Sequence, residues 1–101
     1  MPNLPAELVK EIQTIAAQYP SVQKVVLFGS RARGDNRPNS DIDLAVWADE
    51  DFKGRGAFAF DIDDVRTLLK IDLAIIQPYT DQTFLANIQK DGVLLYERLP
   101  E

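Results

Sequence analysis

The sequence predicts an α/β domain in which helices pack over a small sheet. Two observations predict it: helix-like and strand-like apolar patterns alternate along the whole chain, and turn residues separate one pattern from the next. A chain of 101 residues, of which 46% are hydrophobic, can bury one core of its own. We therefore expect one domain over residues 1–101 and no internal boundary.

The first helix and the first strand have the clearest patterns. Leu8 and Ile12 belong to an apolar series at three- and four-residue spacing, which predicts an amphipathic helix over 4–19 with Pro5 in its first turn. The apolar run before Gly29 predicts a strand over 22–28. The segments expected next are a short helical turn over 30–34, a polar loop over 35–39 and a second strand over 42–47.

The second half of the chain continues the alternation. Phe58, Ile62 and Val65 recur at helical spacing and predict a helix over 57–69. Either Thr80 or Asp81 is expected to cap the helix that follows. The remaining segments expected here are a loop over 49–56, a strand over 71–76, a helix over 81–90 and a short last strand over 93–96.

The composition excludes several kinds of chemistry. Without Cys or His, the chain has no thiolate or imidazole metal site and no imidazole base. The net charge of -5 argues against direct binding to long nucleic acid, which needs a basic face. The N-terminus lacks a signal-peptide pattern, and no apolar run approaches the ~20 residues of a membrane span. We expect a cytoplasmic protein that uses carboxylates, hydroxyls, amides and basic side chains.

Gly29-Ser30 lies where a predicted strand ends and a helical turn begins. Glycine lets a phosphate approach the backbone closely, and amides at a helix N-terminus are free to bind anions. Ser30 adds a hydroxyl donor, and Arg31 and Arg33 follow with guanidinium groups suited to phosphate oxygens. These residues predict a phosphate-binding turn, although an ordinary turn with surface ion pairs would use the same residue types.

Asp41-Ile42-Asp43 opens the second predicted strand. Side chains alternate across a strand, so Asp41 and Asp43 share one face while Ile42 points into the core. Two carboxylates on one face repel each other unless a cation lies between them, and hard oxygen ligands favour Mg²⁺ or Mn²⁺. The alternative is a solvated end of the strand, where acidic residues often collect.

The spacing of these segments strengthens the prediction of one site. Ten residues separate Ser30 from Asp41, enough for a helical turn and a loop that reverses the chain. If the first two strands are antiparallel neighbours, Gly29-Ser30 and the Asp pair face each other. Asp72 opens the third strand among apolar neighbours, where an unpaired carboxylate is costly. A third strand parallel to the second would bring it to the same edge.

Other acidic and aromatic residues have simpler interpretations. Asp61, Asp63 and Asp64 form a second acidic cluster, which we expect at the start of a helix or on a solvated face. Phe58 and Phe60 are expected in the core rather than as platforms that stack on a nucleobase.

The stretch VVLFGSRARGDNRPNSDIDLAV resembles the signature of the polymerase-β-like nucleotidyltransferase superfamily. Its Gly-Ser pair, ten-residue gap and Asp-x-Asp spacing are similar to those of the small branch called minimal nucleotidyltransferase (MNT) domains. The C-terminal GVLLYER is similar to the last strand of those proteins, so the resemblance covers essentially the whole chain.

The resemblance implies a mixed sheet of three to four strands in the order 1-2-3, with helices packed over it. It also implies that Asp41, Asp43 and Asp72 hold two Mg²⁺ ions, or Mn²⁺, around a nucleoside triphosphate. Gly29 and Ser30 would hold the β- and γ-phosphates. Asp72 would be the best candidate for the base that activates the incoming hydroxyl.

The resemblance further implies a protein partner. MNT proteins are commonly paired with an α-helical HEPN ribonuclease toxin, and members of the family transfer AMP from ATP to a tyrosine of that toxin. The expected function is therefore that of an antitoxin in a hetero-oligomer, and a thin core also makes a homodimer reasonable. One alternative is a catalytically silent module that neutralises the partner by binding. Another is transfer to a small molecule, which the lack of room for an acceptor domain disfavours.

Overall fold

The computed structural model describes residues 4–49, 51–65 and 67–99. The elements in these ranges are α1 (Ala6–Ala17), β1 (Val22–Phe28), α2 (Ser30–Arg33), β2 (Ile42–Ala48), α3 (Arg55–Asp63), β3 (Ile71–Ile76), α4 (Gln82–Asp91) and β4 (Val93–Glu97). Their order is the predicted one, and Pro5 precedes α1 as its N-cap instead of lying in its first turn. No helix in these ranges has the length and hydropathy needed to cross a membrane.

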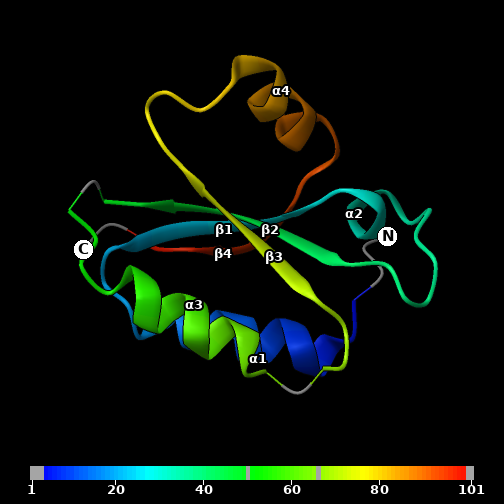
Figure 1. Ribbon diagram of the computed structural model, residues 1–101, viewed down its shortest axis with the longest axis horizontal. Helices are drawn as coiled ribbons and strands as arrows, with labels where there is room; N and C mark the ends of the chain where they lie inside the picture. The colour runs from blue at the N-terminus through cyan, green and yellow to red at the C-terminus, as the bar shows by residue number, and fades with distance from the viewer. Residues whose placement is uncertain (1–3, 50, 66, 100–101) are drawn as a thin grey trace.

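The strands form one mixed sheet in the order β3-β2-β1-β4. β1 runs antiparallel to β2 and β4, whereas β2 and β3 are parallel. The predicted neighbours 1-2-3 are confirmed, and β4 extends the sheet at the outer side of β1. Figure 1 shows α1 and α3 on one face of the sheet and α4 alone on the other, with α2 at the end of β1.

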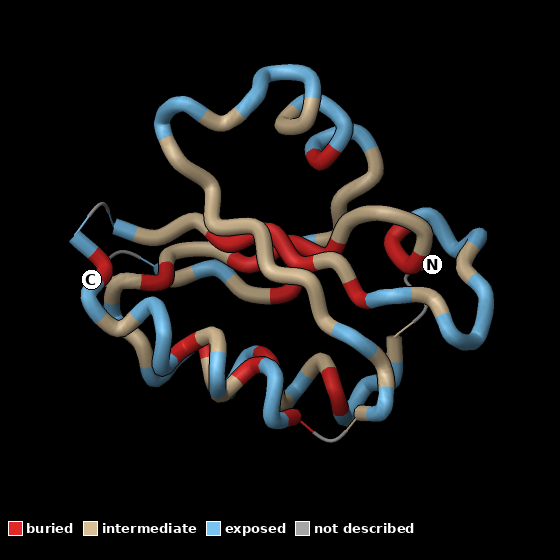
Figure 2. The backbone as a smooth tube through the Cα atoms, viewed as in Figure 1, coloured by how far each residue is buried: buried red, intermediate tan, exposed pale blue. Residues whose placement is uncertain are grey.

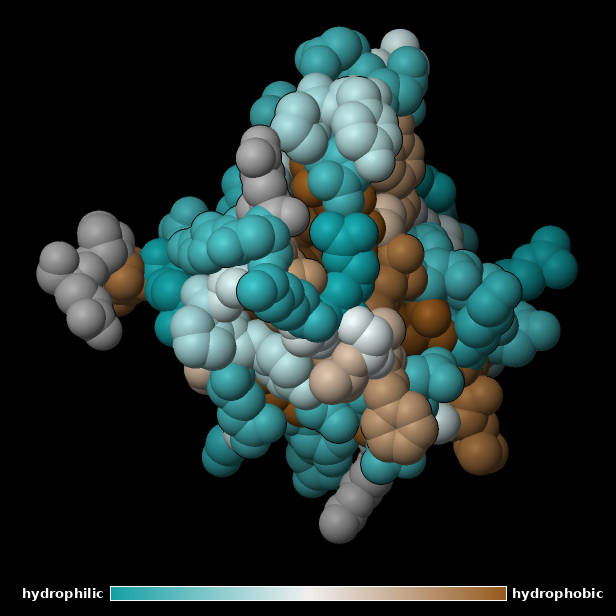
Figure 3. Space-filling view, turned by 60° about the vertical axis from the view of Figure 1, so that its left-hand side comes forward, coloured by the Kyte–Doolittle hydropathy of each residue, from teal (hydrophilic) through white to brown (hydrophobic). Residues whose placement is uncertain are grey.

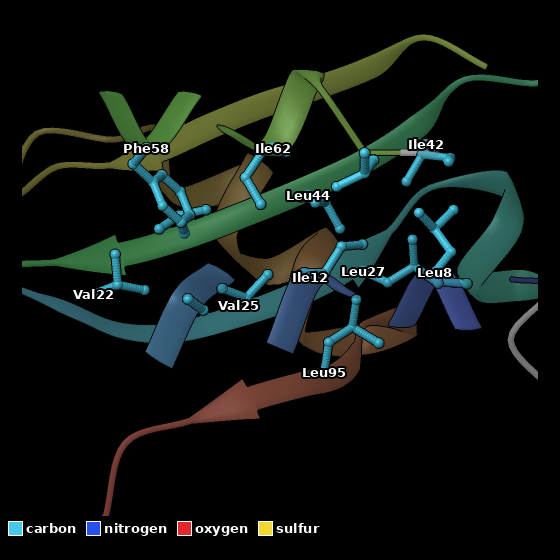
Figure 4. Close-up of a cluster of buried hydrophobic side chains, with 14 of the residues drawn as sticks. Leu8, Ile12, Val22, Val25, Leu27, Ile42, Leu44, Phe58, Ile62 and Leu95 are labelled. Atoms are coloured by element: carbon cyan, nitrogen blue, oxygen red, sulfur yellow. The ribbon is translucent and has the colours of Figure 1, made fainter. Parts of the chain in front are cut away.

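The main core lies between the sheet and the pair α1 and α3. Alternate strand residues point to this side, so Ile42, Leu44 and Val46 are fully buried while the residues between them face the other way. Figure 4 shows side chains from both helices and from β1, β2 and β4 pointing toward one another. The largest contributors from the helices are Leu8, Ile12, Phe58 and Ile62.

The opposite face carries a smaller apolar cluster. Val26, Ala45 and Ile88 are buried there, and most of α4 is exposed, as Figure 2 shows. Figure 3 shows hydrophobic surface in the hollow between the lobe formed by α4 and the rest of the molecule. Because Asp43 alternates with the core residues of β2, its carboxylate lies on this less covered face, where a ligand can reach it.

The helix predicted over 57–69 is shorter than expected. α3 ends at Asp63 because its last turn carries acidic side chains and no basic one, which is unfavourable at the negative end of a helix dipole. The Thr67 hydroxyl then accepts a backbone N–H two residues further on, which stabilises a turn instead of a helix. Arg66, within the predicted helix, lies outside the described residues.

Three neighbouring predictions were confirmed only in part. The acidic cluster lies at the end of α3 and not at a helix start. Asp63 and Asp64 are exposed, as expected for a solvated face, whereas Asp61 is partly buried and accepts a hydrogen bond from the Tyr19 hydroxyl. Phe58 is buried as expected, but the Phe60 side chain is 71% exposed. The loop predicted over 49–56 gives way to α3 at Arg55, and its Glu50 lies outside the described residues.

Candidate active site

The backbone at the end of β1 packs directly against a carboxylate. Gly29 has φ 76° and ψ -158°, a conformation that is essentially restricted to glycine. A Cβ built on it would overlap Oδ2 of Asp43 and lie 3.3 Å from its Cγ. Gly29 and Asp43 are therefore in contact, although fourteen positions separate them in the sequence.

The short helix α2 begins immediately after this contact. The carbonyl oxygen of Gly29 accepts backbone hydrogen bonds from Ala32 (3.1 Å) and Arg33 (3.2 Å), which fold the chain back over the end of β1. Gly34 ends the turn in the left-handed conformation, and its N–H donates to the Ser30 carbonyl at 2.8 Å. Ser30, as the first residue of α2, therefore lies next to the Gly29–Asp43 contact.

Sheet register brings the predicted carboxylates to the same end of the sheet. Asp43 is the register partner of Phe28 on β1 and of Asp72 on β3, so Asp43 and Asp72 lie side by side on one face. Asp41 precedes β2 and is exposed. Burial raises the pKa of Asp43, and the charges of Asp72 and then Asp41 raise it further. Asp43 is thus repelled by both of the other carboxylates.

This donor set suits a hard divalent cation. A cation relieves repulsion between neighbouring carboxylates, and oxygen ligands are those that Mg²⁺ and Mn²⁺ prefer. In the described part of the chain, no three or more His, Cys, Asp or Glu side chains converge closely enough to form a ready-made cage. Instead, Nζ of Lys70 lies 3.4 Å from Oδ1 of Asp72, and both side chains are exposed.

Arg31 has a different environment from the predicted one. Its side chain is buried, with only 5% exposed. Nε donates to the Ser40 carbonyl and Nη2 to the Pro38 carbonyl, both at 3.1 Å. The guanidinium therefore braces the loop that leads into Asp41, a positioning role that the sequence interpretation missed.

Arg33 remains at the surface of the site. Nε forms an ion pair with Oδ2 of Asp35 at 3.0 Å. The hydrogen bond to Asp35 and its charge raise the pKa of Arg33, with smaller contributions from Asp91 and Asp43. Arg33 therefore lies within electrostatic reach of Asp43 and faces the approach to Gly29.

A cavity of about 390 Å³ adjoins the Gly29 turn on the α4 side of the sheet. Phe28 and Phe84 meet there edge to face, with ring centroids 5.4 Å apart. Phe84 was not among the residues that the sequence placed at the site. Phe84 borders the site because its ring packs against Phe28, which lies opposite Asp43, and no local sequence pattern reports this contact.

Comparisons with known proteins agree with this geometry. The family described as "Polymerase beta, Nucleotidyltransferase" matches residues 10–101. No curated protein matches the chain significantly. A Sulfolobus solfataricus protein assigned as a nucleotidyltransferase is 27% identical, with a TM-score of 0.57, over 91% of this chain and 79% of that one.

Two further structures share the fold. A chain in the crystal structure of a toxin–antitoxin with AMP-PNP is 24% identical, with a TM-score of 0.61, over 89% of this chain and 73% of that one. A chain in the structure of a tri-AMPylated Shewanella oneidensis HEPN toxin in complex with an MNT antitoxin is 22% identical, with a TM-score of 0.54, over 91% and 71%. From the family match, which spans nearly the whole sequence, the chain belongs to the polymerase beta nucleotidyltransferase family.

Proposed function

We propose that this protein transfers AMP from ATP to a tyrosine hydroxyl of a HEPN-type toxin and thereby acts as its antitoxin. The observation that carries the proposal is the contact of Gly29 with Asp43, which is itself the register partner of Asp72. A turn suited to phosphate and a pair of carboxylates suited to divalent cations thus occupy one end of the sheet. Phosphoryl-transfer sites need this combination, because catalysis there depends on positioning and charge neutralisation.

The residues divide into two groups by their chemistry. Asp41, Asp43 and Asp72 would hold two Mg²⁺ ions, or Mn²⁺, which when bound neutralise charge on the triphosphate. The Gly29 backbone and the Ser30 hydroxyl would bind the β- and γ-phosphates. Arg33 would add a positive charge on the side of the approaching nucleotide, once its exposed pair with Asp35 opens, which costs little.

Proton transfer is assigned to Asp72. In the reaction, the acceptor oxygen forms a bond to the α-phosphorus while the bond to pyrophosphate breaks, and the hydroxyl proton moves to a carboxylate. Asp72 lies on β3, the edge strand, and 45% of its side chain is exposed, so a hydroxyl on another protein can approach it. Asp43 is less suited because it packs against Gly29.

The proposed partner rests on the structural relatives and on charge. The relatives include complexes of toxins with antitoxins, one of them with a HEPN toxin that carries AMP groups. A net charge of -5 favours association with a basic protein, such as one that binds RNA.

The test is transfer of labelled AMP from ATP to the protein encoded by the neighbouring gene, in the presence of Mg²⁺. The double variant Asp41→Asn with Asp43→Asn should abolish labelling while circular dichroism shows a folded domain. Asp63→Asn with Asp64→Asn is the matched control, because it removes two exposed carboxylates from the end of α3.

Neutralisation of the partner should be measured in parallel. If the wild type and the Asp41/Asp43 double variant neutralise the partner equally and neither labels it, the enzymatic proposal fails. The chain would then be a binding module that acts by complex formation.

A further inference from the structure

The cavity beside Gly29 has the size and lining of a small-molecule site. Its volume of about 390 Å³ falls within the usual range for ligand pockets, roughly 300–1,000 Å³. Its walls come from the end of β1, from the turn that follows it with α2, and from one face of α4. The lining residues that matter here are Phe28, Gly29, Arg33, Phe84, Asn87 and Asp91.

The cavity continues the site already described. Gly29 and Arg33 belong both to the turn assigned to the phosphates and to the cavity wall. A nucleotide whose β- and γ-phosphates lie on Gly29 and Ser30 carries its nucleoside one phosphate further on, so a cavity that shares Gly29 with this turn is within reach of the nucleoside. A second hollow under α4, which Trp47 and Leu85 line, includes neither Gly29 nor Arg33. It therefore shares no wall with the turn assigned to the phosphates.

The apolar part of the cavity suits a flat aromatic ring. Phe84 is partly buried, and its ring meets Phe28 at an interplanar angle of 88°. Two rings at a right angle form a corner, and an incoming ring that stacks on one of them contacts the edge of the other. Stacking of a nucleobase on an aromatic side chain contributes about 1–3 kcal/mol.

The polar part of the cavity lies along the same face of α4. Asn87 is three residues after Phe84 and Asp91 is four residues after Asn87, so their side chains follow one another on one side of the helix. Asn87 is exposed at the mouth of the cavity. Its amide offers one donor and one acceptor direction, which match N7 and the N6 amino group of adenine. Guanine presents two acceptors, N7 and O6, at the same edge. It therefore pairs with the amide N–H of Asn87 and leaves the amide oxygen without a donor.

We infer that this cavity is the nucleoside subsite, in which Phe84 stacks on the base, Asn87 selects adenine over guanine and Asp91 accepts hydrogen bonds from the ribose hydroxyls. The inference rests on the proposed function, since it takes the triphosphate to lie at Gly29 and Ser30. It adds a reason for ATP preference, which no motif in the sequence supplies.

The test is equilibrium binding measured by calorimetry with Mg²⁺ and three probes: a non-hydrolysable ATP analogue, the corresponding GTP analogue and inorganic tripolyphosphate. Phe84→Leu keeps an apolar side chain against Phe28 but removes the ring, and should weaken binding of the ATP analogue roughly 5- to 150-fold. Asn87→Ala should bring the affinities for the two nucleotides close together. Neither variant should change the affinity for tripolyphosphate.

Two controls keep the outcome clear. Gln89→Ala removes an exposed amide from the same helix, on the side of the other hollow, and should bind all three probes like the wild type. Asn87→Ala changes an exposed helical position to the best helix former, so it tests the inference even if Phe84→Leu unfolds α4.

The possible results separate the two proposals. Wild-type affinity of both variants for the ATP analogue, with tripolyphosphate still bound, would overturn the nucleoside subsite and leave the transferase proposal standing. Equal affinity of the wild type for the ATP analogue and for tripolyphosphate would also overturn the nucleoside subsite and leave the transferase proposal standing. A wild type that binds none of the probes would refute the transferase proposal together with the subsite that rests on it.

Discussion

Replacing Gly29 with alanine tests the contact on which the site depends. Two separate effects should destabilise this variant. The backbone conformation of Gly29 is one that residues with a Cβ avoid, and adopting it costs about 1–3 kcal/mol. The added methyl group would also overlap the carboxylate of Asp43, which must move. At roughly 4–8 °C per kcal/mol for a domain of this size, the strain alone should lower Tm measurably.

The two effects can be separated by a double-mutant cycle. Asp43→Ala removes the overlapping oxygen and leaves the Asp43 Cβ 3.6 Å from the new methyl group, an ordinary contact. In that background, Gly29→Ala should cost only the backbone strain. The difference between the two costs, measured by urea unfolding, gives the energy of the overlap.

Gly56→Ala is the matched control for the same substitution. Gly56 is the second residue of α3, and a Cβ there meets no atom within 4 Å. Alanine at this position should leave the free energy of unfolding unchanged or raise it by up to about 1 kcal/mol. The reasoning is refuted if Gly29→Ala unfolds within about 0.5 kcal/mol of the wild type and transfers label at the wild-type rate.

Three further predictions follow from groups in and around the sheet. The pKa of Asp43 is raised above 3.8 in the folded protein, so without divalent cations the wild type should lose stability relative to Asp43→Asn as the pH rises above that value, which urea unfolding in EDTA checks. The hydrogen bond to Asp61 raises the pKa of Tyr19 above 10.0, so the stability of the wild type relative to Tyr19→Phe should be constant below pH 10.0 and fall as the pH rises through the folded-state pKa. Asp81 caps α4 by accepting from the Phe84 N–H at 3.1 Å, so Asp81→Ala should lower the free energy of unfolding by about 1 kcal/mol, and an unchanged Tm would argue against this cap.

Local sequence signals were sufficient to place most of the elements. The strands over 22–28 and 71–76 have the predicted bounds, because mostly apolar residues, several of them β-branched, form each of them and a turn residue follows. The strand order 1-2-3 was expected from the family resemblance. The directions of pairing were expected only as conditions under which Gly29, Asp43 and Asp72 would meet, and the structure has both directions. The chemistry assigned to these residues remains a prediction that the transfer and binding experiments test.

Other features depended on tertiary contacts that no local pattern reports. Val65 continued the helical spacing after Ile62, yet α3 ends at Asp63, since Val65 is buried from the turn that follows. The arginine that follows Ser30 resembled a surface phosphate ligand, whereas the fold buries Arg31 under the loop before Asp41. Burial of a charged side chain depends on nearby backbone carbonyls, which the sequence alone does not place.

The position of β3 at the margin of the sheet has a consequence for how the protein behaves in solution. An edge strand with the sequence IDLAII presents unpaired backbone groups and apolar side chains, which favour pairing with other chains and aggregation. Asp72 is the only charged residue within it, and such a charge on an edge strand opposes that pairing. We therefore expect the residue assigned to proton transfer also to oppose aggregation, so Asp72 variants need to be assessed for solubility before any loss of activity is attributed to chemistry.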